Sequence, residues 1–376
     1  MKIKKYENII FITVFFAIIT AVGISIFILP TKSFSEAENR NLKQFPKIRR
    51  ESVLNGEFFD DLGEFYRDQL PLRRELGYLY SMTELALGKH ESNGIIYTLG
   101  GKLIARPEGV NENIYNANMQ DISKLCASNK KFTVFIPPST VQVFSESFHC
   151  ALQKNKFYPS LGELGDGFLD EILSVSNKDR YYYTTDHHWT SDGAYLAYLR
   201  ICKYFGIEPY AEDHFTVQNI SDSFYGSSYR ISALPKQLCH PDNIAIYRYD
   251  DDSLFTLTDA DGNVIMNGFY DFGAKDKSDK YLIFLGGNYP YLSVKMQSKK
   301  ARPKLLLIKD SFANSVVPFL ALHYDIEMID PRYADPSMID TLMNDGKFDR
   351  ILLLCSAQTM ATEKKIGLFA DKLCLH

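Results

Sequence analysis

The sequence predicts an α/β protein in which helices cover both faces of a parallel β-sheet, preceded by one membrane-spanning helix. The first observation is that short apolar runs alternate with helical periodicity, the pattern of strands buried on both sides. The second is a charge-free apolar run near the N-terminus. The third is composition: of 376 residues, 45% are hydrophobic, and the net charge is −4. This composition excludes wholesale disorder and a strongly basic nucleic-acid-binding surface.

The N-terminal run is predicted to be an uncleaved membrane anchor. Residues 9–29 carry no charge, end before Pro30, and as a helix would span the roughly 30 Å hydrocarbon layer. A cleaved signal peptide and a buried core helix are the alternatives. The run exceeds the usual signal-peptide length of about 7–15 apolar residues, and no A-x-A site precedes Pro30. Three lysines precede it, whereas Lys32 follows with Glu36 and Glu38 nearby, so the C-terminal bulk is expected outside the cytoplasm.

The remaining chain is predicted to be a stalk followed by one large domain. Residues 31–55 are mostly polar and form the expected stalk, and residues 56–376 form the domain. Its first expected elements are two helices and a hairpin, over 58–69, 72–87 and 95–105.

After residue 110, helices and strands alternate. Strands are expected over 132–136, 180–183, 281–285, 305–308, 326–329 and 351–354. Helices are expected over 111–128, 168–175, 191–204, 312–322, 337–343 and 360–373. Residues 206–300 differ because short strands at 244–249, 254–258 and 264–266 are separated by Asp/Gly turns. We expect this stretch to be a β-rich insertion lying over the parallel sheet.

Residues suited to catalysis or binding follow most of the predicted strands. In open α/β sheets, ligands bind beyond the carboxyl ends of the strands. The residues at these ends include Ser139, Asp186 and His188, Gly287 and Asn288, Ser311, Asp330 and Arg332, and Ser356. We therefore expect several of them to meet at one edge of the sheet.

Ser311, His188 and Asp186 are the candidate catalytic residues. Serine is a weak nucleophile unless a base takes its proton. Asp186 and His188 are two residues apart, so in an extended segment their side chains share a face, and the carboxylate can fix the tautomer of the imidazole. The plainer interpretation is that Asp310-Ser311 only caps a helix. Asp192, at the start of the predicted 191–204 helix, is expected to cap that helix rather than orient His188.

Four further residues are candidates for contacts with a substrate. Gly287 and Asn288 could stabilise an oxyanion through a backbone N–H and a side-chain amide, although Gly-Gly-Asn is also an ordinary turn. Arg332 is either a substrate contact or a salt-bridge partner of Asp330. Trp189 is either a platform for a sugar ring or a core residue.

Asp186, His187 and His188 could be metal ligands, since Asp and His suit zinc, whereas nucleotide and common zinc-peptidase chemistry have no support in the sequence. Three consecutive residues such as Asp186-His187-His188 rarely converge on one ion, so no metal is expected, and His187 is expected to make a structural hydrogen bond. Motifs of the types G-x-S-x-G, G-x-x-x-x-G-K-[ST] and H-E-x-x-H are absent, and no cofactor is predicted.

The six cysteines contain no C-x-x-C pair, and some are expected to be free buried thiols.

Several segments resemble the DHHW protein family. The hallmark is Tyr183-Thr184-Thr185-Asp186-His187-His188-Trp189-Thr190, followed by Gly193-Ala194-Tyr195. The other matching segments are Glu38-Asn39-Arg40, Asp68-Gln69-Leu70-Pro71-Leu72-Arg73, Phe284-Leu285-Gly286-Gly287-Asn288 and Lys309-Asp310-Ser311-Phe312. The resemblance covers roughly residues 34–376. The family is similar to the SGNH-hydrolase-like proteins of alginate and other exopolysaccharide O-acetylation.

The resemblance implies an SGNH-hydrolase-like sheet with Ser311 as nucleophile, His188 as base and Asp186 as the orienting carboxylate. It implies an extracytoplasmic acetyltransferase or esterase acting on cell-surface polysaccharide. A separate membrane O-acyltransferase would supply acetyl groups, since no CoA motif is present. The chain departs from the pattern at Lys309, where Gly is common, and at Cys355-Ser356-Ala357-Gln358, where Gly-x-Asn is usual. The alternative is therefore a non-catalytic glycan-binding or assembly protein on a decayed hydrolase fold.

Overall fold

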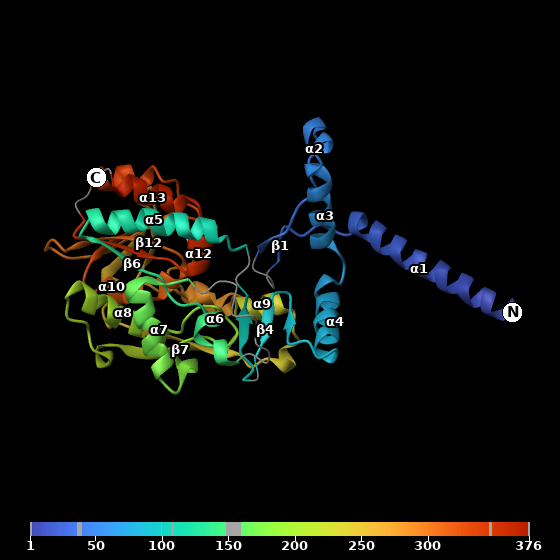
Figure 1. Cartoon of the computed structure of the whole chain (residues 1–376), viewed down its shortest axis with the longest axis horizontal. Coiled ribbons are helices and arrows are strands. Elements are labelled where there is room, and N and C mark those ends of the chain that lie inside the picture. The colour runs from blue at the N-terminus through green and yellow to red at the C-terminus, as the bar shows by residue number, and fades with distance from the viewer. Residues whose placement is uncertain are drawn as a thin grey trace. The chain divides into compact units, whose positions relative to one another are not determined.

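The computed structural model describes residues 2–35, 40–98, 100–106, 109–147, 159–345 and 348–374 (Figure 1). The expectations for Glu36, Glu38, Asn39, Leu99 and Cys150 lie outside these residues. The chain divides into two compact units, here called the first and second units. The first comprises Met1–Lys89 with Ala233–Pro235, and the second comprises His90–Ser232 and Lys236–His376. Their boundary lies at residue 89, later than the boundary at residue 55 expected from composition.

The first unit is mostly helical. Its helices are α1 (Lys2–Ile28), α2 (Arg50–Leu54), α3 (Glu57–Gln69) and α4 (Arg73–Ala86), and its strands are β1 (Phe34–Ser35) and β2 (Arg40–Asn41). Within α1, residues Asn8–Ile28 have a mean hydropathy of 2.7 and are long and apolar enough to cross a membrane.

The expected stalk is tied to helix α3 by an ion pair. Arg40 Nη1 and Nη2 donate to the two carboxylate oxygens of Asp68 at 2.8 and 2.6 Å, and the Lys43 N–H donates to Asp68 at 2.8 Å. The Arg40 hydrogen bond, with the Lys43 N–H and the charge of Arg73, lowers the pKa of Asp68 to about 2 against the effect of burial. Two of the family-like segments, which contain Arg40 and Asp68, are therefore joined.

The second unit is built on a seven-stranded sheet of order β10-β9-β11-β13-β12-β14-β6. In that order the strands are Val264–Asn267, Phe255–Thr258, Tyr291–Met296, Asp325–Ile329, Lys304–Lys309, Arg350–Leu354 and Phe132–Phe135. Strands β13, β12, β14 and β6 pair in parallel, and β11, β9 and β10 continue the sheet in antiparallel pairs. The predicted parallel core is confirmed.

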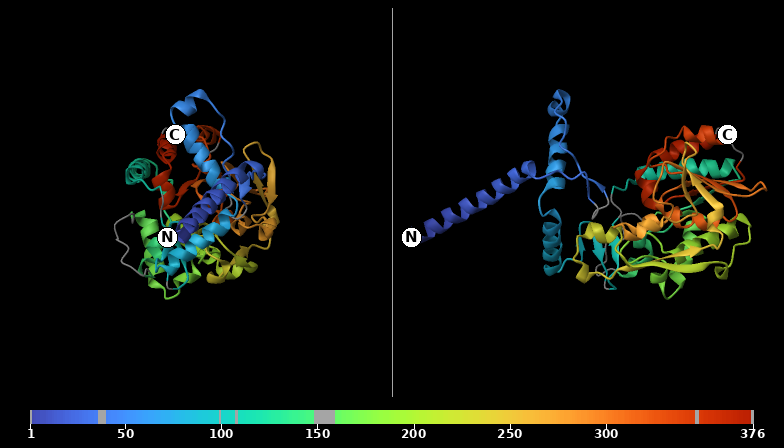
Figure 2. Two further views of the ribbon diagram at one scale, coloured as in Figure 1. Left: turned by 90° about the vertical axis from the view of Figure 1, so that its right-hand side faces the viewer. Right: turned by 180° about the vertical axis from the view of Figure 1, so that it is seen from behind.

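Helices cover both faces of this sheet because its strands are apolar on both sides. Along β12, Leu305 and Leu307 enter one core cluster, whereas Leu306 and Ile308 enter the other. One face carries α5 (Glu112–Ser128), α11 (Met338–Asp345), α12 (Ala357–Thr362) and α13 (Lys365–Cys374). The other carries α7 (Gly162–Ser174), α8 (Ser191–Phe205) and α10 (Val317–Leu320). Figures 1 and 2 show the two helical layers.

Smaller elements complete the second unit. They are β3 (Glu91–Ser92), β4 (Ile95–Tyr97), β5 (Leu103–Ala105), α6 (Thr140–Val143), β7 (Thr216–Phe224), α9 (Ser227–Ser232) and β8 (Asp242–Arg248). The predicted hairpin is β4 paired with β5. Among the described cysteines, Cys202, Cys239 and Cys355 are buried free thiols, and Cys126 and Cys374 are exposed free thiols.

Three sequence expectations about elements are wrong. The insertion does not simply lie over the sheet, since β9, β10 and β11 extend its edge and only β7 and β8 form a separate ribbon. Residues 180–183 and 281–285 are not sheet strands: 3₁₀ turns form at Lys178–Arg180 and Lys280–Ile283. The expected 312–322 helix is a 3₁₀ turn, Ser311–Ser315, followed by the short α10.

Candidate active site

Ser311 follows the central parallel strand β12, where Asp310 organises the turn. The buried Asp310 carboxylate accepts hydrogen bonds from Phe312 N–H at 3.0 Å, Ser356 N–H at 2.7 Å and the Thr359 hydroxyl at 2.8 Å. Capping by Asp310 is therefore real, and it leaves Ser311 free to face the site. Ser311 is the first residue of a five-residue 3₁₀ turn rather than of a long helix.

Asp186, His188 and Ser311 form a continuous hydrogen-bonded chain. His188 Nε2 lies 2.8 Å from Ser311 Oγ, and His188 Nδ1 lies 2.6 Å from Asp186 Oδ1. Asp186 Oδ1 also accepts the His188 N–H at 3.0 Å. With Nδ1–H donated to the carboxylate, Nε2 presents its lone pair to the serine hydroxyl. This arrangement has the geometry required to activate a serine nucleophile.

Neighbouring residues hold the carboxylate and the imidazole. Ser227 N–H donates to Asp186 Oδ2 at 2.6 Å. Gly226 passes so close that a Cβ there would clash with the Asp186 side chain. The Tyr281 ring stacks on the His188 ring at a centroid distance of 3.9 Å and an interplanar angle of 8°, and its hydroxyl lies 3.3 Å from Ser311 O and from Ser315 Oγ. Both side chains of the Asp–His pair are therefore fixed from several directions.

The segment that carries this pair is anchored from two sides. Asp242 accepts hydrogen bonds from the Thr184 and Thr185 N–H groups, both at 2.7 Å, and from the Thr185 hydroxyl at 2.6 Å. Lys102 Nζ donates to the carbonyls of Tyr182 at 3.0 Å and Tyr183 at 3.2 Å. Although residues 180–183 do not join the main sheet, these contacts fix the approach to Asp186.

The electrostatics favour an ionised carboxylate. Burial alone would raise the pKa of Asp186. The positive charges that His188 and His187 carry when protonated, together with the hydrogen bonds from His188 and Ser227, instead hold it well below its usual range. Partial burial and the charge of His188 lower the pKa of His187 to about 4, so His187 is neutral at pH 7. His187 Nδ1 contacts Ser227 Oγ at 2.7 Å, the structural hydrogen bond expected from the sequence.

The structure places the Gly287-Asn288 turn beside the nucleophile turn but changes the expected donors. Three consecutive residues have positive φ: Leu285 at 61°, Gly286 at 74° and Gly287 at 124°. The Gly287 N–H donates within this turn to Phe284 O at 3.3 Å, so it is not the free donor we expected. Asn288 is exposed, and its Oδ1 accepts from Asn314 Nδ2 at 3.2 Å. Its own side-chain NH₂ remains the candidate oxyanion donor, with the first N–H of the Ser311 turn.

Arg332 and Trp189 take the plainer of the roles considered for them. Arg332 forms a two-pronged ion pair with the buried Asp330, at 2.9 Å from Nε and 2.6 Å from Nη2. Trp189 is fully buried, so of its two possible roles it is a core residue and not a platform for a sugar ring. Its Nε1–H donates to Phe312 O at 3.0 Å and Ser315 Oγ at 2.9 Å, bracing the nucleophile turn from behind. Trp189 is therefore not available to a substrate, whereas Arg332 is partly exposed and a substrate contact for it stays a prediction.

The Asp186, His187 and His188 ligand atoms lie within 4.8 Å of one another. Each of these three side chains is already engaged in a hydrogen bond with the protein. A metal ion at this cluster would displace the contacts that orient His188.

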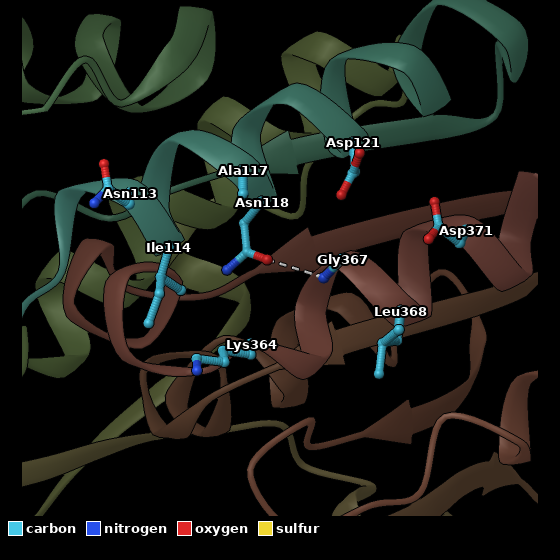
Figure 3. Close-up of a pocket in the computed structure, with 9 residues that line it drawn as sticks. All are labelled: Asn113, Ile114, Ala117, Asn118, Asp121, Lys364, Gly367, Leu368 and Asp371. Atoms are coloured by element: carbon cyan, nitrogen blue, oxygen red, sulfur yellow. Dashed lines mark hydrogen bonds between the residues drawn. The ribbon is translucent and has the colours of Figure 1, made fainter.

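A cavity of about 310 Å³ lies elsewhere, between α5 and α13 (Figure 3). Asn118 crosses it and accepts a hydrogen bond from the Gly367 N–H at 3.0 Å. The cavity lies on helices that cover one face of the sheet and contains none of the candidate catalytic residues.

Sequence reasoning missed three residues that shape the site: Ser227, Tyr281 and Asn314. Ser227 lies 41 residues after Asp186, and only the folded chain brings its N–H to the carboxylate. Tyr281 fell within an expected strand, so nothing in the sequence indicated that its ring would stack on His188. Asn314 fell within an expected helix.

Comparisons with known proteins agree with the fold and with the family resemblance. Residues 155–329 match the family model described as DHHW protein. A crystal structure of a DHHW family protein from Eubacterium siraeum matches with a TM-score of 0.56 and 20% identity, over 74% of this chain and 95% of that chain. No curated protein matches.

Two structures of Bacillus cereus PatB1 match with a TM-score of 0.55 over 72% of this chain. One carries a sulfonyl adduct and is 21% identical, with 96% of its chain covered. The other is 22% identical, with 98% covered. The α/β fold and the resemblance to the DHHW family are thereby confirmed.

Proposed function

We propose that the chain is a serine acyltransferase or esterase that transfers or removes acetyl groups on cell-surface polysaccharide. In this proposal α1 anchors the chain in the membrane, and the catalytic domain acts on the extracytoplasmic side. The observation that carries this proposal is the Asp186–His188–Ser311 chain, with contacts of 2.6 and 2.8 Å. A side-chain array of this kind is costly to maintain in a protein interior unless each member is paired, as here.

In the first half-reaction, His188 Nε2 takes the proton of Ser311 Oγ as that oxygen attacks the acetyl carbonyl carbon. The tetrahedral oxyanion is stabilised by the Ser311 N–H and the Asn288 amide. When it collapses, the bond from carbon to the donor's oxygen breaks, and His188 returns the proton to that oxygen. Ser311 is left as its acetyl ester, and Asp186 stabilises the imidazolium at each step.

In the second half-reaction, a hydroxyl group attacks the acetyl ester. His188 takes the proton of the attacking hydroxyl, and Ser311 leaves with a proton from the same imidazole. A sugar hydroxyl as acceptor gives transfer, and water gives hydrolysis. The family resemblance supports polysaccharide as the acetylated partner and a membrane O-acyltransferase as the source of acetyl groups.

The non-catalytic alternative has less support. Lys309 and the segment after β14 depart from the usual pattern, but both have structural contacts at the site. Ser356 and Thr359 bind Asp310, and Lys309 binds Asn314. A decayed site would have no reason to retain a complete hydrogen-bonded triad. The sulfonyl adduct named for PatB1 indicates that a neighbour with this fold carries a nucleophile that such reagents modify.

The test is covalent trapping of Ser311. Purified full-length protein in detergent would be treated with phenylmethanesulfonyl fluoride and mapped by peptide mass spectrometry. We expect the adduct on Ser311, no adduct in Ser311→Ala, and much slower labelling in His188→Ala. Ser139→Ala, which changes another serine after a parallel strand, should label normally. An unlabelled Ser311 in folded wild-type protein, together with no hydrolysis of acetyl esters, would overturn the proposal.

A further inference from the structure

The most unusual residue beside the nucleophile is Lys309, a buried cation at the end of the central strand. Only 1% of its surface is exposed, and burial lowers its pKa to about 8. Its Nζ lies 2.6 Å from Asn314 Oδ1. A buried ammonium group is costly unless it is paired, so this hydrogen bond is a strong constraint on Asn314.

The lysine fixes which way the Asn314 amide faces. An ammonium group can only donate, so the Asn314 oxygen must face Lys309 and its NH₂ must face away. That NH₂ donates to Gly287 O at 3.3 Å and to Asn288 Oδ1 at 3.2 Å. Asn314 is itself only 1% exposed, so no solvent competes for its amide.

The orientation of the Asn314 amide in turn fixes the orientation of the Asn288 amide. Because its Oδ1 is held by Asn314, its own NH₂ is left to donate elsewhere. The turn that presents it contains three consecutive residues with positive φ, including Leu285, and such a turn needs contacts that hold it in place. Lys309, Asn314 and the turn therefore form one directed series of hydrogen bonds that ends at the candidate oxyanion donor.

We propose that Lys309 and Asn314 are positioning residues that orient the Asn288 amide toward the oxygen of the acyl group. This inference rests on the proposed function and deepens it.

Asn314→Asp is the sharpest variant. It keeps the shape and the partner of Lys309 but removes the NH₂ that donates to Asn288. The Asn288 amide would then turn over to donate to the new carboxylate, and its donor would be lost to the substrate. We expect kcat for 4-nitrophenyl acetate to fall about 10- to 100-fold, with KM and the melting temperature nearly unchanged.

Three further variants complete the experiment. Lys309→Met should lower kcat in the same way, and the double variant Lys309→Met/Asn314→Asp should be no worse than Asn314→Asp alone, because both act through one series of contacts. Lys304→Met, at the other end of β12, is the matched control and should keep wild-type kcat and KM. Asn288→Ala, at an exposed position, should show the kcat loss without any change in folding.

The outcomes separate the two proposals. An active wild type with unchanged kcat in Asn314→Asp, or additive losses in the double variant, would overturn the positioning role alone. Unfolding of the Lys309 and Asn314 variants together with full activity of Asn288→Ala would also overturn it, since their role would be structural. A wild type with no esterase activity and no sulfonyl labelling of Ser311 would overturn the proposed function itself.

Discussion

Asp186 rather than Asp192 occupies the position that controls His188. Asp192 lies in the first turn of α8, but Thr190 is the actual cap: its hydroxyl accepts the Gly193 N–H at 3.2 Å. The capping role expected for Asp192 is wrong. Its carboxylate instead accepts hydrogen bonds from Arg180 Nε at 2.6 Å and the Tyr247 hydroxyl at 2.7 Å.

The exchange of each carboxylate for an amide should separate these roles. In Asp186→Asn the amide favours the wrong imidazole tautomer, so turnover should fall about 10³-fold or more while the fold persists. In Asp192→Asn a partly exposed ion pair is lost, which should cost about 1 kcal/mol or less with turnover kept. Hydrolysis of an acetyl ester and thermal melting would be measured for both. Full activity of Asp186→Asn would contradict the assignment.

Tyr281 fixes the plane of the His188 ring through its own ring, more than through its hydroxyl. Tyr281→Phe keeps the stacking face and loses two weak contacts of 3.3 Å, so kcat should stay within about threefold of wild type. Tyr281→Leu removes the flat face, and kcat should fall about tenfold or more. Equal kcat for the two variants would show that the stacked ring does not position the base.

At the scale of elements, the segment before Asp186 depends on a buried lysine from the β4–β5 hairpin region. Lys102 Nζ is surrounded by the Tyr182 and Tyr183 carbonyls, Asp179 Oδ1 at 2.9 Å and the Phe144 ring at 4.0 Å. Lys102→Met leaves two carbonyls without this donor, and the free energy of unfolding should fall by about 1–3 kcal/mol. Lys178→Met, which loses only a surface ion pair with Glu146, should change it by about 0.5 kcal/mol or less. Denaturant melts would compare the two.

The β-rich region carries a buried carboxylate that weakens the fold at neutral pH. Burial is the main cause that raises the pKa of Asp252 to about 6, and in the described part of the chain its Oδ1 has no hydrogen-bond partner. An acid whose pKa is raised on folding binds more protons folded than unfolded, so stability falls as pH rises from about 4 to 6. Asp252→Asn should therefore raise the melting temperature at pH 7, and the gain should vanish below pH 4. A gain that persists below pH 4 would exclude titration of Asp252 as its cause.

The parallel strands could be predicted from sequence because each is a short, continuous apolar run. Such a run is typical of a strand whose side chains are buried on both faces of a sheet. The expected strands over 180–183 and 281–285 failed because their apolar residues pack as aromatic core without joining a ladder. Tyr182 and Tyr281 are buried, but turn geometry and local capping by Asp279 decide the backbone. We expected His188 to lie near Ser311 because both would follow strands of the parallel sheet. Only Ser311 does so, since residues 180–183 do not form a strand of that sheet.

The donors around the triad could not be predicted from sequence because they come from contacts across long stretches of chain. Asp186 meets Ser227, and Asn314 meets Gly287 and Asn288, only once the insertion has folded against the sheet. The motif predicted the candidate catalytic side chains, whereas the tertiary structure decides which N–H and amide groups surround them.

At the scale of the whole molecule, the proposed anchoring by α1 would decide where the proposed chemistry takes place. The 21 residues Asn8–Ile28 have the length and hydropathy of a membrane span, and lysines precede them. The positive-inside tendency predicts that the second unit lies outside the cytoplasm, where the proposed polysaccharide substrate would be accessible. Protease added to intact cells should degrade residues after α1 and spare an N-terminal tag. If α1 is the uncleaved anchor that we propose, a chain extracted from membranes should retain the mass of the full sequence. Protection of the second unit would reverse the topology, and a mature N-terminus near residue 30 would make α1 a signal peptide and the enzyme a released one.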